Sequence, residues 1–459
     1  MVNRKDSTAD IILAAHFLGG VVFGLFPALV LYFTFIVFIY FTYKSFNAVE
    51  TAGYGAAYIV GLEMLMRLSR SSVPHEFAKY AVCVILLPGI FKKRALPIPI
   101  IIYGLVQVPA FFLADGGDLE ATRQLISFNF SGPLCLVFST IYFYNKPMDE
   151  SSLRRIFLHI LYPIAAILGF LLIRTPSVEE ITFGFSSNIE ASSYGPNQVA
   201  SILGLSILIF GFCYIFKIRL FQSYITFFVF LLMAAYRGLL TFSRGGMAAP
   251  IIILIGILVY LYFGTRFRFN IKVVVSILVL AAIVFFSFEY VNDLTQNALY
   301  RRYSGEREKG VVSTAKYTSG RSLILAVDWE IFKANPVLGV GTGMGKYYRE
   351  KYLGQKMAAH IEYSRLLAEN GVLGLLALFL LLWYPIKRFF EIGSPVQRSL
   401  LLACVGFCLT FMAHSATRIA APCFVYGLAF VTIVWTNTNN KRKLINREVN
   451  EPAKSIAGN

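Results

Sequence analysis

Apolar runs long enough to cross a lipid bilayer recur along almost the whole chain. A helix needs about 20 consecutive apolar residues to cross roughly 30 Å of hydrocarbon, and lipid offers its backbone amides no partner outside the helix. Of the 459 residues, 57% are hydrophobic and only 15% are charged, and the mean hydropathy is +0.65. These proportions exclude a soluble globular chain and predict an all-α polytopic membrane protein.

The apolar runs predict about 14 transmembrane helices. The run at 11–43 is too long for one comfortable helix, and Gly24 and Pro27 offer a break inside it, so we count two spans there. The predicted spans are 11–25, 28–43, 53–66, 77–91, 98–114, 125–144, 155–173, 197–216, 220–240, 245–263, 271–290, 366–386, 399–416 and 419–436.

The basic residues outside the spans indicate the orientation. With 14 spans most Lys and Arg clusters fall on one side, which the positive-inside rule identifies as the cytoplasm. The other side receives segment 291–365, where twelve basic residues against seven acidic ones give a net charge of +5. The positive-inside rule does not hold for long translocated loops. The excess of basic residues is therefore compatible with a loop whose charge has no function, or with a basic surface that binds phosphate. The clusters on the predicted cytoplasmic side are Arg4 with Lys5, Lys44, Lys92 to Arg94, Lys146 with Arg154 and Arg155, Lys217 with Arg219, Arg266 with Arg268, Lys387 with Arg388, and 441–443.

These features divide the chain into five predicted regions. The long segment is the one with alternating polar and apolar pieces, so we expect a large extracytoplasmic loop that carries short helices. The regions are a transmembrane scaffold at 1–196, transmembrane core helices at 197–290, the loop at 291–365, C-terminal transmembrane helices at 366–436 and a disordered cytoplasmic tail at 437–459.

Two arginines bracket a predicted outer hairpin in YRGLLTFSRGG. Both guanidinium groups would lie at the level of the lipid headgroups, where arginine often serves only as an interface anchor. We expect that role for Arg237. The glycine pair after Arg244 permits close approach of the backbone to a ligand or a neighbour, which favours a functional role for Arg244.

Arg321 opens a segment that predicts an amphipathic helix in or near the membrane interface. The helix should end at Asn335 and Pro336. The GVGTGMG that follows lacks the GxGxxG order and a preceding strand, so it indicates a flexible turn rather than a nucleotide-binding loop. The apolar positions that carry the helix pattern are Leu323, Leu325, Trp329 and Phe332.

His360 lies just before the span at 366–386, and Tyr363 and Ser364 would share its helical face. Histidine can exchange a proton near neutral pH, although a lone histidine at a helix start is more often a cap or an interface residue. The tyrosines of this region could stack on sugar rings or form an interfacial belt, the commoner use of tyrosine there. They are Tyr347, Tyr348, Tyr352 and Tyr363.

No set of residues has the spacing of a metal site, so we expect a metal-free protein without a cofactor. The six cysteines lie in apolar runs without CxxC spacing, which also argues against a disulfide framework. The remaining histidines, His16, His75, His159 and His414, show no mutual spacing suited to a metal.

Three pieces in this order resemble the O-antigen ligase and Wzy-type polymerase superfamily of bacterial envelope enzymes. They are SRGG after a helix, then GRSLILAVDWEIFKANPVLGVGTGMG, then AHIEYSRLLAENGVLGLL running into a span. The resemblance covers roughly 195–385 and begins at YGPNQVAS, which resembles the family's Asn-containing helix start at Asn197. Arg244 and Arg321 match the family's essential arginines, and His360 matches its loop histidine. The family usually has Asn after that histidine, whereas this chain has Ile361.

The resemblance implies a glycosyltransferase of the bacterial inner membrane with its active face in the periplasm. Such enzymes move a glycan from undecaprenyl pyrophosphate to an acceptor hydroxyl without a metal or a nucleotide sugar. The expected catalytic residues are His360, Arg321 and Arg244, with Arg237, Asn197 and Tyr363 as substrate-binding residues. The expected partners are a lipid-linked glycan donor, a glycan or lipid acceptor and membrane lipids, and no nucleic acid.

The sequence leaves the acceptor open. The predicted span number exceeds that of the family's ligases by about two, which favours a polymerase slightly over a ligase. Two other classes stay possible. A transporter or flippase would need ionisable residues deep in its helices, for which Glu63, His159 and Glu289 are candidates. A structural protein with a basic loop for anionic lipid or polysaccharide would suit the net charge of +17.

Overall fold

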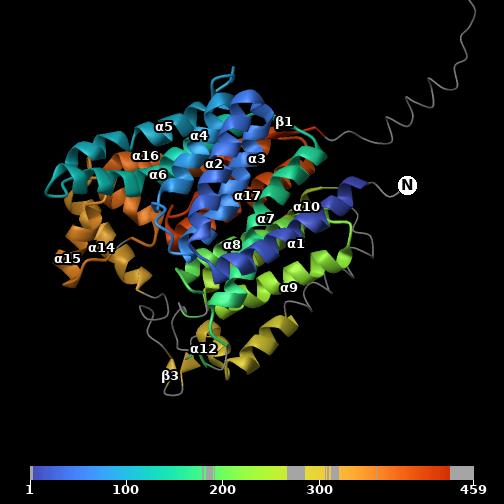
Figure 1. Cartoon of the computed structure of the whole chain (residues 1–459). Helices are drawn as coiled ribbons and strands as arrows, with labels where there is room; N and C mark the ends of the chain where they lie inside the picture. Colours follow the sequence, from blue (N-terminus) through green and yellow to red (C-terminus); the bar gives the residue numbers. More distant parts are fainter. Residues whose placement is uncertain are drawn as a thin grey trace, which may run out of the picture.

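The described part of the chain is a bundle of helices with four two-residue strands (Figure 1). The computed structural model describes residues 4–177, 180–181, 190, 192–265, 285–304, 306–307, 310–311, 320–357 and 359–434. The longer helices are α1 (Arg4–Leu25), α2 (Leu29–Asn47), α3 (Ala52–Leu68), α4 (Phe77–Ile90), α6 (Leu119–Phe143), α7 (Glu150–Arg174), α8 (Pro196–Ile215), α9 (Tyr224–Leu240), α10 (Arg244–Gly264), α14 (Arg321–Ala334), α16 (Glu362–Glu391) and α17 (Pro395–Ser415).

Shorter elements connect these helices. The helices are η1 (Val49–Thr51), α5 (Ile98–Leu105), η2 (Val108–Leu113), α12 (Ala298–Ser304), α15 (Gly345–Leu353) and α18 (Ala420–Leu428). Strand β1 (Pro147–Met148) pairs in parallel with β4 (Thr432–Ile433), and β2 (Glu306–Arg307) pairs antiparallel with β3 (Gly310–Val311).

Eight of the described helices are long and apolar enough to cross a membrane, which confirms an all-α, multi-span protein. The count of 14 stays a prediction. The predicted spans at 77–91, 98–114 and 220–240 form shorter apolar helices, and most of 271–290 lies outside the described residues. The span expected at 419–436 contains only the nine-residue α18, because the chain turns afterwards to pair β4 with β1.

The break expected near Pro27 is present. Helix α1 ends at Leu25 and α2 begins at Leu29, and each is a membrane-length helix. Glycine makes the packing of α1 on α7 close: a Cβ on Gly20 would lie 2.0 Å from the carbonyl oxygen of Ala166. Helix α1 therefore packs on α7, whereas α2 packs on α3.

Several of the predicted basic clusters lie close to residues next to β1 or to one another, whereas Arg266, Arg268 and 441–443 lie outside the described residues. Arg154 donates hydrogen bonds to the carbonyls of Arg219 and Leu220, and Lys93 donates to the carbonyl of Tyr144. Helices α14 and α15 lie toward the opposite end, where α8, α10 and α16 begin (Figure 1). The bundle therefore has a basic end and a distinct end that holds the candidate site.

Helix α16 is broken near its start. Gly371 has φ 60° and ψ −137°, a conformation that is essentially restricted to glycine. The break frees backbone groups inside an apolar bundle, and segment 336–343 supplies their partners. The N–H of Val340 donates to the carbonyl of Ala368 at 3.0 Å, and the N–H of Val372 donates to the carbonyl of Pro336 at 2.7 Å.

This segment overlaps GVGTGMG at 339–345, which the sequence suggested as a flexible turn. Residues 340–343 are buried instead. Gly339 has φ +70°, and a Cβ there would lie 2.4 Å from the backbone of Glu369. The N–H of Gly343 donates to Oε2 of Glu369 at 3.0 Å. The glycines thus let the backbone of this segment pack directly against the backbone of α16 at its break. We call residues 336–343 the glycine clamp.

Candidate functional site

The predicted residue Asn197 lies where α8 and α10 begin side by side. The hydroxyl of Ser243 donates to Oδ1 of Asn197 at 2.8 Å, and the hydroxyl of Ser201 lies 2.7 Å from the Asn197 carbonyl. Ser201 also lies 3.0 Å from Nε2 of His414, at the end of α17. Because Nδ1 of His414 lies 2.7 Å from the carbonyl of Thr410, that nitrogen carries a proton.

The glycine pair after Arg244 serves this helix junction. A Cβ on Gly245 would lie 2.9 Å from Cγ of His414, and a Cβ on Gly246 would lie 2.6 Å from that of Ala200. Any larger side chain would push α10 away from α8 and α17. The pair therefore sets Arg244, the first residue of α10, directly beside His414 and the start of α8.

Arg321 and Arg244 occupy one neighbourhood. Arg321 is the first residue of α14. Its burial lowers the pKa of the guanidinium, and the nearby charge of Arg244 lowers it further. The charge of Arg321 also reaches His414. The starts of α8, α10 and α14 therefore converge, and each helix start adds a partial positive charge to the two arginines, an arrangement that favours an anion.

His360 is held beside the turn between α17 and α18. The N–H of Ala416 donates to the His360 carbonyl at 3.1 Å, and Nη2 of Arg418 donates to the carbonyl of Ala359 at 2.8 Å. The turn is itself anchored, because Arg67 donates to the Arg418 carbonyl at 2.8 Å. Backbone bonds thus fix His360 in place, although it lies outside any helix.

The imidazole of His360 is neutral at neutral pH. Burial lowers its pKa to about 4, and the charges of Arg418, Arg321 and Arg349 contribute in that order. A neutral imidazole can accept a proton or donate a hydrogen bond, depending on its tautomer. The charge of Arg321 thus reaches His360, and the charge of Arg244 reaches Arg321, so Arg321 lies within electrostatic range of both other predicted catalytic residues.

The buried carboxylates of the described residues are engaged elsewhere. Oδ1 of Asp328 accepts from Nε of Arg349 at 2.6 Å, and both side chains are almost fully buried. Arg365 pairs with Glu362 at 2.6 Å and with Glu369 at 2.8 Å. The fourth, Glu63, pairs with Arg67 at 2.7 Å. These acids neutralise Arg349, Arg365 and Arg67.

Two predicted substrate-binding residues contact other parts of the bundle. Arg237 donates from Nη1 to the hydroxyl of Thr175 at 2.8 Å, at the end of α7. The hydroxyl of Tyr363 donates to the carbonyl of Leu409 in α17 at 2.6 Å. Ser364, expected on the same face as Tyr363, donates instead to Asp328. The substrate-binding roles of Arg237 and Tyr363 stay predictions, whereas their hydrogen bonds within the bundle are part of the structure.

Several residues of the site carry only a weak signal in the sequence. His414 was dismissed for lack of a metal spacing, and Arg418 and Ser201 were not singled out. Arg302 was missed as well: it is buried, and its Nε lies 3.4 Å from the carbonyl of Phe242, in the hairpin before Arg244. The signal that could have drawn attention to α17 is an apolar span that ends in His and Arg, here in AHSATR at 413–418.

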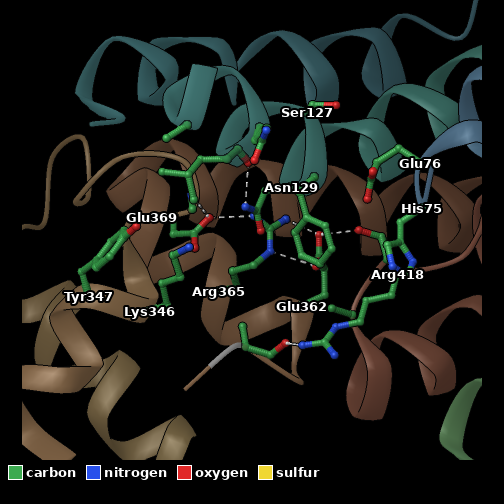
Figure 2. A pocket seen from close by; sticks show the side chains of 18 of the residues that line it. His75, Glu76, Ser127, Asn129, Lys346, Tyr347, Glu362, Arg365, Glu369 and Arg418 are labelled. Atoms are coloured by element: carbon green, nitrogen blue, oxygen red, sulfur yellow. Dashed lines mark hydrogen bonds and ion pairs between the residues drawn. The ribbon is translucent and has the colours of Figure 1, made fainter. Parts of the chain in front are cut away.

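A cavity of about 640 Å³ borders the segment before His360 (Figure 2). Ala359, the residue before His360, and Arg418 line it, together with the starts of α6 and α16. Lys346 and Tyr347 stand at one end of the cavity and His75 and Glu76 at the other, with the pair of Arg365 and Glu362 between them (Figure 2). Among the described residues, no group of three or more His, Cys, Asp or Glu side chains could hold a metal ion.

Residues 227–379 match a family model described as Wzy_C, O-Antigen ligase. No curated protein matches the chain. The matched third of the chain contains Arg244, Arg321 and His360, and Asn197, His414 and Arg418 lie outside it. The family is one of glycan transfer in polysaccharide biosynthesis, which implies lipid-linked substrates and a membrane environment. The matched segment, which holds Arg244, Arg321 and His360, supports the similarity of the chain to the O-antigen ligase and Wzy-type polymerase superfamily.

Proposed function

We propose that the protein transfers a glycan from undecaprenyl pyrophosphate to an acceptor hydroxyl, without a metal, at the periplasmic face of the bacterial inner membrane. The observation that carries the proposal is the convergence of Arg244, Arg321 and His360, which lie on three separate segments. The basic clusters at the far end of the bundle support a cytoplasmic location for that end and a periplasmic one for the site.

The arginines suit the leaving group. Breaking the bond between the anomeric carbon and the diphosphate leaves negative charge on the diphosphate oxygens. Guanidinium groups that are already in position stabilise this developing charge more than they stabilise the ground state, through charge-assisted and bidentate hydrogen bonds. Arg244 and Arg321 are the assigned groups, and the starts of α10 and α14 add to their field.

His360 is assigned to the acceptor. The attacking hydroxyl must lose its proton as it forms the new bond to the anomeric carbon, and a neutral imidazole can accept that proton. Its neutral state in this structure supports the assignment. A single direct displacement of this kind inverts the configuration at the anomeric carbon. His414 supports this arrangement, because its contacts with Ser201 and Thr410 stabilise the helix junction that carries Arg244.

Both acceptor classes agree with the family match, and the predicted number of spans favours a polymerase slightly. The deciding measurement uses purified protein, a synthetic polyprenyl pyrophosphate oligosaccharide and one acceptor at a time. A polymerase lengthens a second lipid-linked repeat, whereas a ligase loads a lipid A core. Release of free polyprenyl diphosphate in either case demonstrates transfer, and an intact donor would favour transport or binding instead.

The variant that tests the site is Arg321→Lys. Lysine keeps the charge but loses the planar pair of donors, so we expect transfer to fall by roughly 10²-fold or more while the protein inserts and purifies normally. Lys333→Ala on the same helix is the matched control, because Lys333 forms only an exposed ion pair with Glu330 at 2.8 Å. Full activity of Arg321→Lys would remove Arg321 from the site.

A further inference from the structure

The cavity beside His360 is a second candidate site for a ligand. It lies between α6, α15 and α16, and neither Arg244 nor Arg321 is among the described residues that line it. Its volume of about 640 Å³ falls within the roughly 300–1,000 Å³ typical of small-molecule sites. The cavity is thus large enough for a sugar and separate from the arginine pair assigned to the diphosphate.

Two polar atoms in its wall are buried without a hydrogen-bond partner in the described structure. One is Nη2 of Arg349, a donor, and the other is Oε1 of Glu76, an acceptor. The Arg349 side chain is 1% exposed. Its Nε and Nη1 are already bonded to Asp328 and to the carbonyl of Met357, so its orientation is fixed. Buried polar groups in proteins are nearly always satisfied by the protein, by ordered water or by a ligand, so these two atoms are open to a partner inside the cavity.

The two unsatisfied atoms specify complementary groups on one ligand. Arg349 needs an acceptor, and an anionic oxygen is the strongest acceptor for a guanidinium. Glu76 needs a donor, which a sugar hydroxyl supplies. Lys346 adds a second cation at the end of the cavity near Tyr347, and its Nζ lies 4.7 Å from the centre of the tyrosine ring (Figure 2). Arg418 links the cavity to the His360 segment through the Ala359 carbonyl.

We propose that this cavity is the acceptor site and that it recognises a sugar bearing a negative charge, either a carboxylate or a phosphate. Arg349 and Lys346 bind the anionic group, and Glu76 accepts from a hydroxyl. The acceptor hydroxyl reaches His360 across Ala359, while the donor diphosphate lies against Arg244 and Arg321. The inference rests on the proposed function and extends it to the class of acceptor.

The test is a calorimetric titration of the purified full-length protein with three probes. Digalacturonic acid carries carboxylates, glucose 1-phosphate carries a phosphate, and galactobiose is neutral. We expect one or both charged probes to bind at least tenfold more tightly than galactobiose, and their order identifies the carboxylate or the phosphate as the source of charge. Equal binding of galactobiose, or no binding of either charged probe, overturns the proposal.

Variants locate the binding. Lys346→Ala removes a half-exposed cation, and Arg349→Lys keeps the charge toward Asp328 while removing Nη2. Each should weaken the preferred charged probe by roughly ten- to a hundredfold, the effect of one charge-assisted hydrogen bond. Lys351→Ala is the matched control, since this exposed lysine lies on the same helix outside the cavity. Should Arg349→Lys fail to fold, Lys346→Ala alone decides, and unchanged affinity in that variant refutes the site.

The two proposals fail separately. Donor cleavage is followed as release of polyprenyl diphosphate, which does not depend on the binding titration. In the transfer assay Lys346→Ala should raise the KM for the acceptor tenfold or more and leave the KM for the donor within a factor of about two. Transfer that proceeds with an unchanged acceptor KM would keep the proposed function and reject the cavity as its acceptor site.

Discussion

Removal of the Asp328 carboxylate tests how the loop that carries Arg321 is held. Asp328 is the central acid between α14, α15 and α16. It accepts from Arg349 at 2.6 Å and from the hydroxyl of Ser364 at 2.5 Å. The side chains of the pair are 0% and 1% exposed. Asp328→Ala therefore leaves a guanidinium buried without its counter-charge and a buried hydroxyl without its acceptor.

The expected cost follows from this burial. Removing one partner of a buried ion pair costs about 3–5 kcal/mol, because the desolvated charge that remains is uncompensated. Glu330→Ala, two residues along the same helix, is the control. Glu330 pairs with Lys333 at 2.8 Å, but the two side chains are 51% and 52% exposed. Water screens such a pair, and its loss costs about 0–1 kcal/mol.

Amide hydrogen exchange of the α14 peptide measures the difference, since local opening exposes its backbone N–H groups. A factor of ten corresponds to about 1.4 kcal/mol, so Asp328→Ala should speed exchange of α14 by roughly 10²-fold or more, and Glu330→Ala by less than about tenfold. Transfer activity should fall in Asp328→Ala alone, because α14 begins with Arg321. Similar exchange in the two variants would refute the assignment of Asp328 as the anchor.

Three further predictions follow from single contacts. Gly371→Ala should lower the thermal stability and abolish most transfer. A Cβ there would lie 2.6 Å from the Pro336 carbonyl oxygen, and the residue has a φ of +60°, which disfavours alanine. A thermal stability equal to that of the wild type would contradict the role of the glycine clamp. Tyr363→Phe should lose about 1 kcal/mol of stability, one hydrogen bond, with transfer per folded molecule unchanged; a rise in KM would instead support the predicted substrate role. The kcat/KM for transfer should stay level from pH 8 to about pH 5 and fall as the pH approaches the His360 value of about 4, measured with saturating acceptor.

The sequence alone could predict the elements that local chemistry determines. Hydropathy placed most helices, since a backbone in lipid must be helical, and the break near Pro27 follows from proline and glycine chemistry. The helix from Arg321 to Ala334 was also predictable from its apolar period. Its predicted apolar residues form the exposed face, with Trp329 51% exposed, while Ile324 and Ile331 face the core.

The glycine clamp was not predictable because its partner is another segment. GVGTGMG permits several backbone conformations, and nothing within it specifies which carbonyls it must bond. The sequence also gives no sign of the break at Gly371, because a single glycine inside an apolar helical pattern is normally tolerated within a helix. Only packing the two segments together shows why both are glycine-rich. Each backbone approaches the other too closely for a side chain, as the 2.4 Å contact at Gly339 shows.

The site could be predicted only in part for a similar reason. The resemblance supplied Arg244, Arg321 and His360, but it could not supply the residues that hold them. Ser201 and His414 are 213 positions apart, and their contact depends on how α8, α10 and α17 pack. Arg418 follows a span and resembles an ordinary interface anchor. Its importance emerges only because its charge is the largest electrostatic influence on His360 after burial.

The low pKa of His360 indicates how the site would coordinate its two substrates. A base with a pKa near 4 accepts a proton poorly at neutral pH, because catalysis is best when the base has a pKa near the working pH. The arginine charges that lower this pKa are the ones proposed to bind the diphosphate or to border the acceptor cavity. A bound diphosphate neutralises part of that charge, so it should raise the pKa of His360 and strengthen the base only when the donor is present. The acid limb of kcat should then lie at a higher pH than that of kcat/KM, since kcat reports the complex and kcat/KM the free enzyme. Coincident limbs would instead leave His360 as a group that orients the acceptor.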